Sequence, residues 1–515
     1  MNLKNTDALL DDAAKLLLAN KWQRAERILR KLLKANPGNP EGLHLAGVAR
    51  HRAGKVKQAC NFVERAIEVA PDIASYRVTL GQMLDEAGEL PSAAIAYEAA
   101  VTLDPLDAET YFALASVWKR LDHLDAAIEC YEKSLEIQPN DAPTLYNMGN
   151  ALKAADKMES AVEAYRMALA ARPDFIPVYK NLGTALKDLG RTAEGFEVLR
   201  AGAKIMFAPK TLSDDEMSFT MRTSVAKLKH DAEQIRYLVA KHRITDNFSD
   251  TAAAYDELVA AQPLSCLPTA SFDLPPAEQS KIDRTYNRLI YLSDGERCQD
   301  AAVNPKLDSN LIQGNYHASK PEITYFDDFL TKDALHLLRE YCLESTIWYT
   351  RYENGYLGAM LGDGFASPLL AQIVDELPQA LPDIFGDHKL NQAWAFKYDS
   401  ELTGINLHAD FAAVNVNFWI TPDAALEDDT AGGLVVWDKE APLDWDFEKY
   451  NADEPAMRQF LAENDAKSVR IPYRENRALV FNSDLFHETD QIAFRPGYEN
   501  RRINVTLLYG DRRSG

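Results

Sequence analysis

The sequence predicts a multidomain α+β protein, in which an N-terminal α-solenoid precedes a β-rich C-terminal region. Proline recurs every 34 residues between Pro37 and Pro173, and a period of this length is typical of stacked helical hairpins. After Pro321 the pattern changes to short runs in which polar and apolar residues alternate, as they do in the strands of a sandwich or barrel. The 515 residues are enough for about three domains.

The solenoid is predicted over residues 1–206, because three kinds of residue keep the same period. A small residue in the first helix of each hairpin and an alanine in the second let the two helices approach closely, and proline ends the unit. This pattern resembles the tetratricopeptide repeat, which implies a superhelix whose inner surface is lined by the first helices. The recurring positions are Pro37, Pro71, Pro105, Pro139 and Pro173, then Ala25, Ala59, Ala93, Ala127 and Ala161, and finally Gly47, Gly81, Ala115, Gly149 and Gly183.

One row of positions on that inner surface becomes basic towards the later repeats. The resemblance places Lys119, Lys153 and Lys187 in this row, beside Tyr146 and Asn150. In a chain of net charge -22, such a row predicts a groove for an acidic or C-terminal segment of a protein partner. The alternative is that the lysines only solvate a helix face.

Residues 207–319 are predicted to form a helical connector, since the period is lost but apolar residues remain at helical spacing. Within the connector, residues 263–276 include four prolines and are predicted to be a linker. Residues 320–515 hold the predicted strands. Their segment 347–364 is rich in aromatic residues and glycine, which makes it a candidate substrate-side loop, with an ordinary surface connection as the alternative.

The candidate chemistry lies in this β region. His408 and Asp410 are two positions apart, and on a strand both side chains point to one face, where they can bind one metal ion. A similar triplet at His123 and Asp125 falls between two helices of the repeats and serves as a control. A later run of strand character ends at His487, which can supply a third ligand.

These residues follow one another in an order that resembles the iron(II)/2-oxoglutarate-dependent oxygenases, especially their prolyl 4-hydroxylase-like branch. The order includes Tyr398, the His408–Asp410 pair, a Gly-Gly turn at 432–433, His487 and two arginines of the last predicted strand. The resemblance covers about residues 320–515 and implies a double-stranded β-helix, or jelly-roll, domain. It also implies that His408, Asp410 and His487 bind iron(II) on one face and leave the other face open for the co-substrate and dioxygen.

The far carboxylate of 2-oxoglutarate needs a fixed cation, and arginine can give it two parallel hydrogen bonds. Alternation along the last strand places Arg502 on one face with Asn504 and so favours it over Arg501. The fifteen residues from His487 to Arg502 are more than is usual in the family, so both arginines stay open. The other co-substrate candidates are Tyr398, Asn417 and Asn504; for Tyr398 and Asn417 the alternative is a hydrogen bond within the core. Ascorbate is a candidate accessory reductant.

Together these assignments predict a hydroxylase that acts on a protein or peptide side chain recruited by the repeats, with succinate and carbon dioxide as co-products. One alternative is a small-molecule oxygenase whose repeats serve assembly, and another is a non-catalytic repeat scaffold. An excess of 78 acidic over 56 basic residues disfavours nucleic acid and anionic membranes as partners. Five cysteines without a paired spacing and no run of about 18 apolar residues lead us to expect a cytoplasmic protein without a membrane span.

Overall fold

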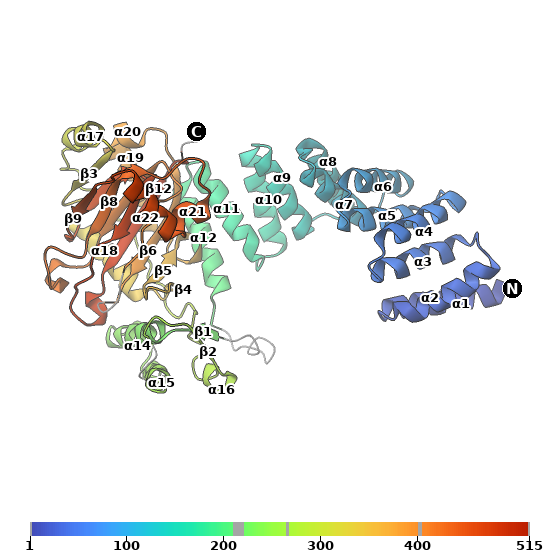
Figure 1. The fold of residues 1–515 in the computed structure, drawn as a ribbon, viewed down its shortest axis with the longest axis horizontal. Coiled ribbons are helices and arrows are strands. Elements are labelled where there is room, and N and C mark those ends of the chain that lie inside the picture. Colours follow the sequence, from blue (N-terminus) through green and yellow to red (C-terminus); the bar gives the residue numbers. More distant parts are fainter. Residues whose placement is uncertain (1–2, 210–220, 264–266, 400–403, 513–515) are drawn as a thin grey trace. The chain divides into compact units, whose positions relative to one another are not determined.

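The computed structural model describes residues 3–209, 221–263, 267–399 and 404–512, with side chains from residue 6 onward (Figure 1). The chain divides into two compact units, Met1–Ala185 and Leu186–Gly515. The division falls within helix α11 (Ile176–Asp188). Helix α12 (Thr192–Met206) therefore belongs to the second unit, although it continues the helical pattern of the first.

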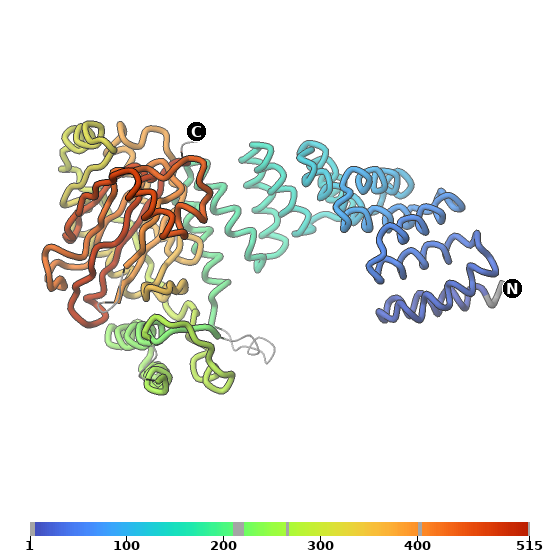
Figure 2. Tube along the Cα trace, in the orientation of Figure 1, coloured from blue at the N-terminus to red at the C-terminus, as the bar shows by residue number. Residues whose placement is uncertain are grey.

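The first unit is a solenoid of helices in which each helix packs against the next, which confirms the predicted α-solenoid (Figure 2). Several first helices of the hairpins begin at a capping side chain: Oδ1 of Asn39 accepts a hydrogen bond from the backbone N–H of Gly42 at 2.6 Å, and Oδ2 of Asp141 accepts one from Thr144 at 2.9 Å. The helices before α11 are α1 (Leu3–Leu18), α2 (Trp22–Ala35), α3 (Pro40–Arg52), α4 (Val56–Val69), α5 (Ala74–Glu86), α6 (Leu90–Leu103), α7 (Ala108–Arg120), α8 (Leu124–Ile137), α9 (Ala142–Ala154) and α10 (Met158–Ala171).

The periodic small residues lie where the two helices of a hairpin touch. A Cβ atom added at Gly47 would lie 2.5 Å from Cγ2 of Val63, and one added at Gly149 would lie 2.5 Å from the ring of Tyr165. Real Cβ atoms do not approach so closely, so a larger residue at Gly47 or Gly149 would force the Val63 or Tyr165 side chain to shift. The packing thus explains one of the three periodic features of the sequence.

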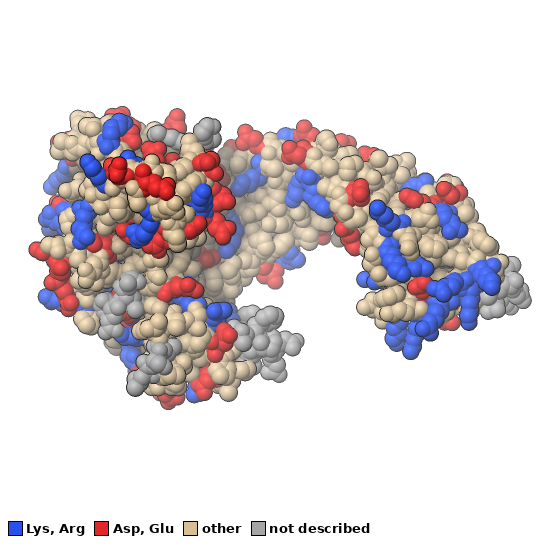
Figure 3. All heavy atoms as spheres, in the orientation of Figure 1, with Lys and Arg blue, Asp and Glu red and all other residues tan. Residues whose placement is uncertain are grey.

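The outer face of α2 is basic. Its Ala25, Leu29 and Leu32 are buried in the repeat core, while the opposite face carries five exposed cations. Figure 3 shows Lys and Arg side chains gathered over the helices next to the N-terminus. The five cations are Arg24, Arg27, Arg30, Lys31 and Lys34.

In the second unit, α14 (Val225–Ala240) and α15 (Phe248–Ala260) form a small core of their own together with the pair of strands β1 (Met221–Thr223) and β2 (Phe272–Leu274). Leu228, Tyr255 and Leu274 are buried in this core. The other α-helices that the described residues of the β-rich part and its connector form are α16 (Pro276–Gln279), α17 (Ser309–Ala318), α18 (Lys332–Glu344), α19 (Pro368–Ala380), α20 (Pro382–Phe385), α21 (Phe447–Asn451) and α22 (Glu454–Glu463).

Two antiparallel sheets make up the β-rich region, which confirms that part of the predicted fold class. Among the described residues, the larger sheet has the order β3 (Ile323–Phe326), β10 (Ala478–Asn482), β7 (Val414–Trp419), β12 (Ile503–Tyr509), β6 (Leu390–Lys397), β5 (Leu357–Met360) and β4 (Thr350–Arg351). The smaller sheet has the order β11 (Leu485–Thr489), β8 (Leu434–Glu440) and β9 (Ser468–Ile471).

The two faces of the larger sheet differ in character, as alternation along β7 shows. Val414, Val416 and Phe418 pack in the main core with residues of α18 and α19. Trp419 lies on the other face, in a second core with residues of the smaller sheet such as Leu434. The buried polar residues of β7 share that second face, so it is the face that carries the candidate site. No helix among the described residues is long and apolar enough to cross a membrane.

Candidate active site

His408, Asp410 and His487 lie together, and one potential ligand atom from each falls within 4.8 Å of the others. His487 is on β11, whereas His408 lies in a loop and forms an isolated antiparallel bridge with His487. The backbone N–H of Asp410 donates to the carbonyl oxygen of Ser483 at 3.1 Å. Residues 408–410 are therefore held by isolated backbone hydrogen bonds and not within a regular strand, but the three side chains converge.

Each imidazole is oriented by a backbone carbonyl. Nδ1 of His408 lies 2.9 Å from the carbonyl oxygen of Asn406, and Nδ1 of His487 lies 3.0 Å from that of Leu485. Since a carbonyl oxygen only accepts, both Nδ1 atoms carry the proton and both Nε2 atoms present a lone pair. These Nε2 atoms face Asp410, at 3.9 Å from Oδ1 for His408 and 3.5 Å from Oδ2 for His487.

The charge state of the cluster suits a divalent cation. Burial, together with the neighbouring His487, lowers the pKa of His408 to about 4, so its imidazole is neutral at pH 7. Burial alone would raise the pKa of Asp410, but its contacts with His487, His408 and the Asn415 amide outweigh the burial, and the pKa of this carboxyl is lowered. Nδ2 of Asn415 also donates to Oδ2 of Asp410 at 2.6 Å. A neutral imidazole beside a carboxylate is what metal binding requires.

The three residues line a pocket between the two sheets. Arg502 lies in the same pocket and is 1% exposed. Its Nε donates to the carbonyl oxygen of Gly432 at 2.6 Å, and Nη2 donates to that of Gly433 at 3.3 Å. Nη1 has no partner among the described residues. The guanidinium carbon lies 4.6 Å from the ring centroid of Tyr398, whose hydroxyl is likewise buried without a hydrogen bond of normal geometry to the described residues.

Arg501 has a different environment. Its Nη2 lies 2.8 Å from Oε2 of Glu233 on α14, and its Nη1 lies 2.8 Å from Oδ2 of Asp399. It does not line the pocket. The structure thus places Arg502 inside the pocket and uses Arg501 to tie β12 to α14.

A chain of amide groups crosses the floor of the pocket. Nδ2 of Asn417 donates to Oδ1 of Asn415 at 2.6 Å, and Oδ1 of Asn417 accepts from Nδ2 of Asn504 at 2.8 Å. Nδ2 of Asn504 also donates to Oγ1 of Thr506 at 3.0 Å. Both amide hydrogens of Asn504 are used in this way, so its unpaired Oδ1 cannot donate to a carboxylate. Asn417 keeps one amide hydrogen for a ligand.

Further lining residues were not among the predicted ones. Trp394 and Phe396 line the pocket beside Tyr398, and they precede it by four and two positions along β6, so alternation from Tyr398 could have found them. Gly432 and Gly433 supply the carbonyl groups that hold Arg502. A Cβ atom at Gly433 would lie 1.8 Å from the carbonyl oxygen of Ile471, so a residue with a side chain does not fit at position 433.

Comparison with known proteins bears on the first unit. Residues 61–108, 108–141 and 130–163 each match a tetratricopeptide repeat family. Residues 61–163 are tetratricopeptide repeats. No curated protein matches the chain.

Three solved structures resemble the chain over the repeat region. MamA is 22% identical, with 31% of this chain and 94% of MamA covered and a TM-score of 0.31. YrrB, described as a TPR protein with an unusual peptide-binding site, is 22% identical, with 33% and 88% covered and a TM-score of 0.31. PilF of Pseudomonas aeruginosa is 19% identical, with 38% and 91% covered and a TM-score of 0.33.

In the tetratricopeptide repeats, Lys119 and Lys153 are half-buried in the last turns of α7 and α9. Burial lowers the pKa of Lys119. Oδ1 of Asn150 accepts from the Tyr165 hydroxyl at 2.8 Å and from Nδ2 of Asn181 at 2.7 Å. Nδ2 of Asn181 also donates to the hydroxyl of Tyr146 at 3.2 Å, so Tyr146 and Asn150 belong to one hydrogen-bonded cluster of the repeats.

Lys187 does not belong to an exposed basic row. It is 7% exposed, its Nζ lies 2.8 Å from Oδ1 of Asp188, and it donates to the carbonyl oxygen of Leu390 at 2.5 Å. Helix α11 ends against the start of β6 here, and the amine satisfies a buried backbone carbonyl. We therefore remove Lys187 from the candidate partner-binding residues, which leaves Lys119, Tyr146, Asn150 and Lys153.

Proposed function

We propose that the second unit is an iron(II)- and 2-oxoglutarate-dependent oxygenase of the prolyl 4-hydroxylase-like branch. We further propose that it hydroxylates a side chain of a protein or peptide bound by the tetratricopeptide repeats. One observation carries the proposal: two imidazole Nε2 atoms and a carboxylate converge at a pocket that also contains a buried guanidinium with an unpaired Nη1.

The donor set fits iron(II). His408, His487 and Asp410 offer two neutral nitrogen ligands and one oxygen, the set found where non-haem iron(II) keeps open positions for other ligands. The hydrogen bonds from Nδ1 to backbone carbonyls and from Asn415 to Asp410 orient all three groups. Iron(II) bound there would supply the oxidation of a substrate C–H bond coupled to decarboxylation of 2-oxoglutarate.

Arg502 would hold the far carboxylate of 2-oxoglutarate. Its Nε and Nη2 are fixed by two backbone carbonyls, so Nη1 is held in place before any ligand binds. The Tyr398 hydroxyl and the remaining amide hydrogen of Asn417 are further donors in the same pocket. A dicarboxylate spanning from Arg502 towards His408 and Asp410 would thus meet donors at one end and the metal ligands at the other.

The strand order supports a double-stranded β-helix. Strands β10, β7, β12 and β6 are adjacent in the larger sheet, and β11, β8 and β9 are adjacent in the smaller one. The segment at His408 adds to the smaller sheet through its bridge to β11. Antiparallel strands that alternate between two facing sheets in this way are typical of a jelly-roll, whose interior holds the proposed site.

The proposal of a protein or peptide substrate rests on the tetratricopeptide repeats, which favour a protein partner. Lys119 and Lys153 would contact acidic groups of that partner, and Tyr146 and Asn150 would contact its backbone or side chains. The small-molecule oxygenase and the non-catalytic scaffold remain the alternatives that an experiment must separate.

The test uses the full chain with iron(II), 2-oxoglutarate and air, in the presence of proteins captured on it without oxygen. We expect succinate release, and a mass increase of one oxygen atom on a captured protein. Asp410→Ala should abolish both while Asp125→Ala retains both. Succinate release without a modified protein would favour a small-molecule substrate, and release at the level of Asp410→Ala would refute the oxygenase assignment.

A further inference from the structure

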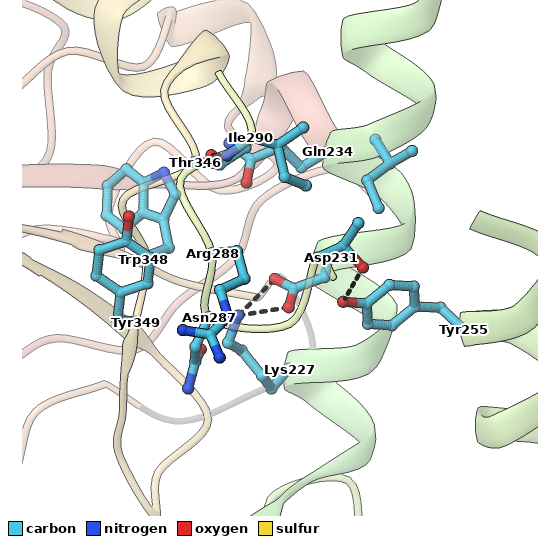
Figure 4. A pocket seen from close by; sticks show the side chains of 12 residues that line it. Lys227, Asp231, Gln234, Tyr255, Asn287, Arg288, Ile290, Thr346, Trp348 and Tyr349 are labelled. Atoms are coloured by element: carbon cyan, nitrogen blue, oxygen red, sulfur yellow. Dashed lines mark hydrogen bonds and ion pairs between the residues drawn. The ribbon is translucent and has the colours of Figure 1, made fainter. Parts of the chain in front are cut away.

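A second pocket lies in the same unit, between α14, the segment 285–290 and the segment 346–349. Figure 4 shows its lining side chains, which include Lys227, Asp231 and Arg288. It shares no lining residue with the pocket that contains His408 and Arg502. The proposed oxygenase chemistry therefore does not account for it.

One wall of this pocket is a compensated ion pair. Nζ of Lys227 lies 2.6 Å from Oδ1 of Asp231, one helical turn away on α14, and the two residues are 3% and 8% exposed. Asp231 also lies 2.9 Å from Nδ1 of the buried His230. This pair carries no net charge, so the charge of the pocket is set by the remaining ionisable group that lines it.

That group is Arg288. Its Nε is buried without a hydrogen-bond partner, and the described residues provide its guanidinium with no ion pair. The hydroxyl of Tyr349 and Oδ1 of Asn287, which line the same pocket, are also buried and unpaired within the described part of the chain. Arg288 is half-buried, and its Nε and the Tyr349 hydroxyl are unpaired donors at one cavity, which indicates a ligand that accepts hydrogen bonds.

The apolar part of the lining indicates the shape of that ligand. Trp348 and Ile235 are 1% and 2% exposed. The ring of Tyr349 is held by stacking on Phe207, with a centroid distance of 3.8 Å and an interplanar angle of 16°. Fixed aromatic surfaces suit a flat apolar group, because such contacts need little ordering of the protein.

We propose that this pocket binds a small monocarboxylic acid with a planar apolar body. The carboxylate would pair with Arg288 and accept a hydrogen bond from Tyr349, and the planar group would lie against Trp348. A single negative charge balances the one uncompensated cation. A phosphate would bring more negative charge than one arginine offsets, so the carboxylate is the better match.

The test measures binding of 4-fluorobenzoate to the full chain by ¹⁹F NMR line broadening. We expect wild-type protein to bind it and Arg288→Gln to bind at least tenfold more weakly. Arg284→Gln, a matched change at an exposed arginine four residues earlier, should bind as wild type does. Arg288→Lys keeps the charge but loses the planar guanidinium, so its affinity for 4-fluorobenzoate should lie between those of Arg288→Gln and wild type. Circular dichroism should show that all variants are folded.

Two further comparisons locate and classify the site. Binding should persist in Arg502→Gln, because Arg502 lines the other pocket, and neutral 4-fluorobenzamide should bind at least tenfold more weakly than the acid. Equal binding to wild type and Arg288→Gln would overturn the proposal. So would loss of binding in Arg502→Gln alone, or displacement of 4-fluorobenzoate by equimolar inorganic phosphate.

Discussion

His408 and His487 face each other across an isolated bridge in which each backbone N–H donates to the other residue's carbonyl oxygen, at 3.0 and 2.8 Å. Their ring centroids are 4.2 Å apart. Residues almost eighty positions apart are thus paired through the backbone before any metal binds. The geometry of the proposed iron site is therefore a property of the fold, and substitutions of its side chains should affect metal binding more than stability.

The first prediction concerns the carboxylate. Asp410→Ala removes the one anionic donor of the set, and we expect iron(II) affinity to fall by more than about a hundredfold, since loss of an outer hydrogen-bonding partner alone costs about 10–100-fold. Metal content after dialysis against a weak chelator measures the effect. Asp125→Ala is the matched control in the repeats, and a normal iron content in Asp410→Ala would contradict the assignment.

Asn415 should act as a positioning residue. Asn415→Leu removes the amide that holds Oδ2 of Asp410, so we expect iron(II) affinity to fall by about 10–100-fold. Asn415→Gln, which keeps the amide, should restore part of the affinity. Equal iron(II) affinities of Asn415→Leu and wild type would contradict the positioning role of the Asn415 amide.

Substitution of Arg502 should change the KM for 2-oxoglutarate, whereas substitution of Arg501 should change the free energy of unfolding. Arg502→Gln should raise the KM for 2-oxoglutarate by about 10–100-fold, because the co-substrate loses a charge-assisted bond. Arg501→Gln removes the cation that pairs with Glu233 and Asp399, so we expect it to lower the free energy of unfolding by about 3–5 kcal/mol with little change in KM. The opposite result for either variant would reverse the roles given to the two residues.

The repeats should capture their partner partly through Lys119 and Lys153. Reversing both to Glu should weaken capture, and the difference from wild type should shrink as salt screens the charges. Arg27→Glu with Lys31→Glu, an equal change of charge on the outer face of α2, is the matched control and should capture normally. If both double variants lose capture equally, net charge and not the groove is responsible.

The first unit should lose stability in mild acid through His44. Burial lowers the pKa of His44 to about 4, and its Nε2 lies 2.9 Å from Oγ1 of Thr79. His44 takes up a proton near pH 6.5 in the unfolded chain but only near pH 4 in the folded one. The free energy of unfolding therefore decreases by about 1–3 kcal/mol as the pH falls from 6.5 to 4. His44→Gln should reduce this slope in urea unfolding followed from pH 7 to 4.

Periodic features of the sequence predicted the structure well because they reflect local packing. The spacing of Gly47, Gly81 and Gly149 by multiples of 34 residues follows from the contact between two helices of one hairpin, which needs no distant residue. Alternation along β12 likewise separated Arg502 from Arg501, since neighbouring side chains on a strand must point to opposite faces.

Features that depend on distant partners were harder to predict. Lys187 occupies the expected position in the repeat pattern, but the Leu390 carbonyl, 203 residues away in sequence, buries it. The unpaired guanidinium of Arg288 belongs to the connector, where no motif marks it. Asn504 shares the polar face of β12, yet only the strand neighbours Asn417 and Thr506 determine that its amide hydrogens are occupied.

The amide chain below the pocket has a direction, and Asp410 sets it. A carboxylate only accepts hydrogen bonds, so Asn415 must turn its nitrogen towards Asp410 and its oxygen towards Asn417. Asn417 must then present its own oxygen to Asn504 and Thr506. The ionised carboxylate of Asp410 thus fixes the direction of the hydrogen bonds across the pocket floor. Asp410→Ala would leave the side-chain amides on β7 and β12 free to exchange the positions of their oxygen and nitrogen atoms, which would change the groups that a co-substrate meets on β12.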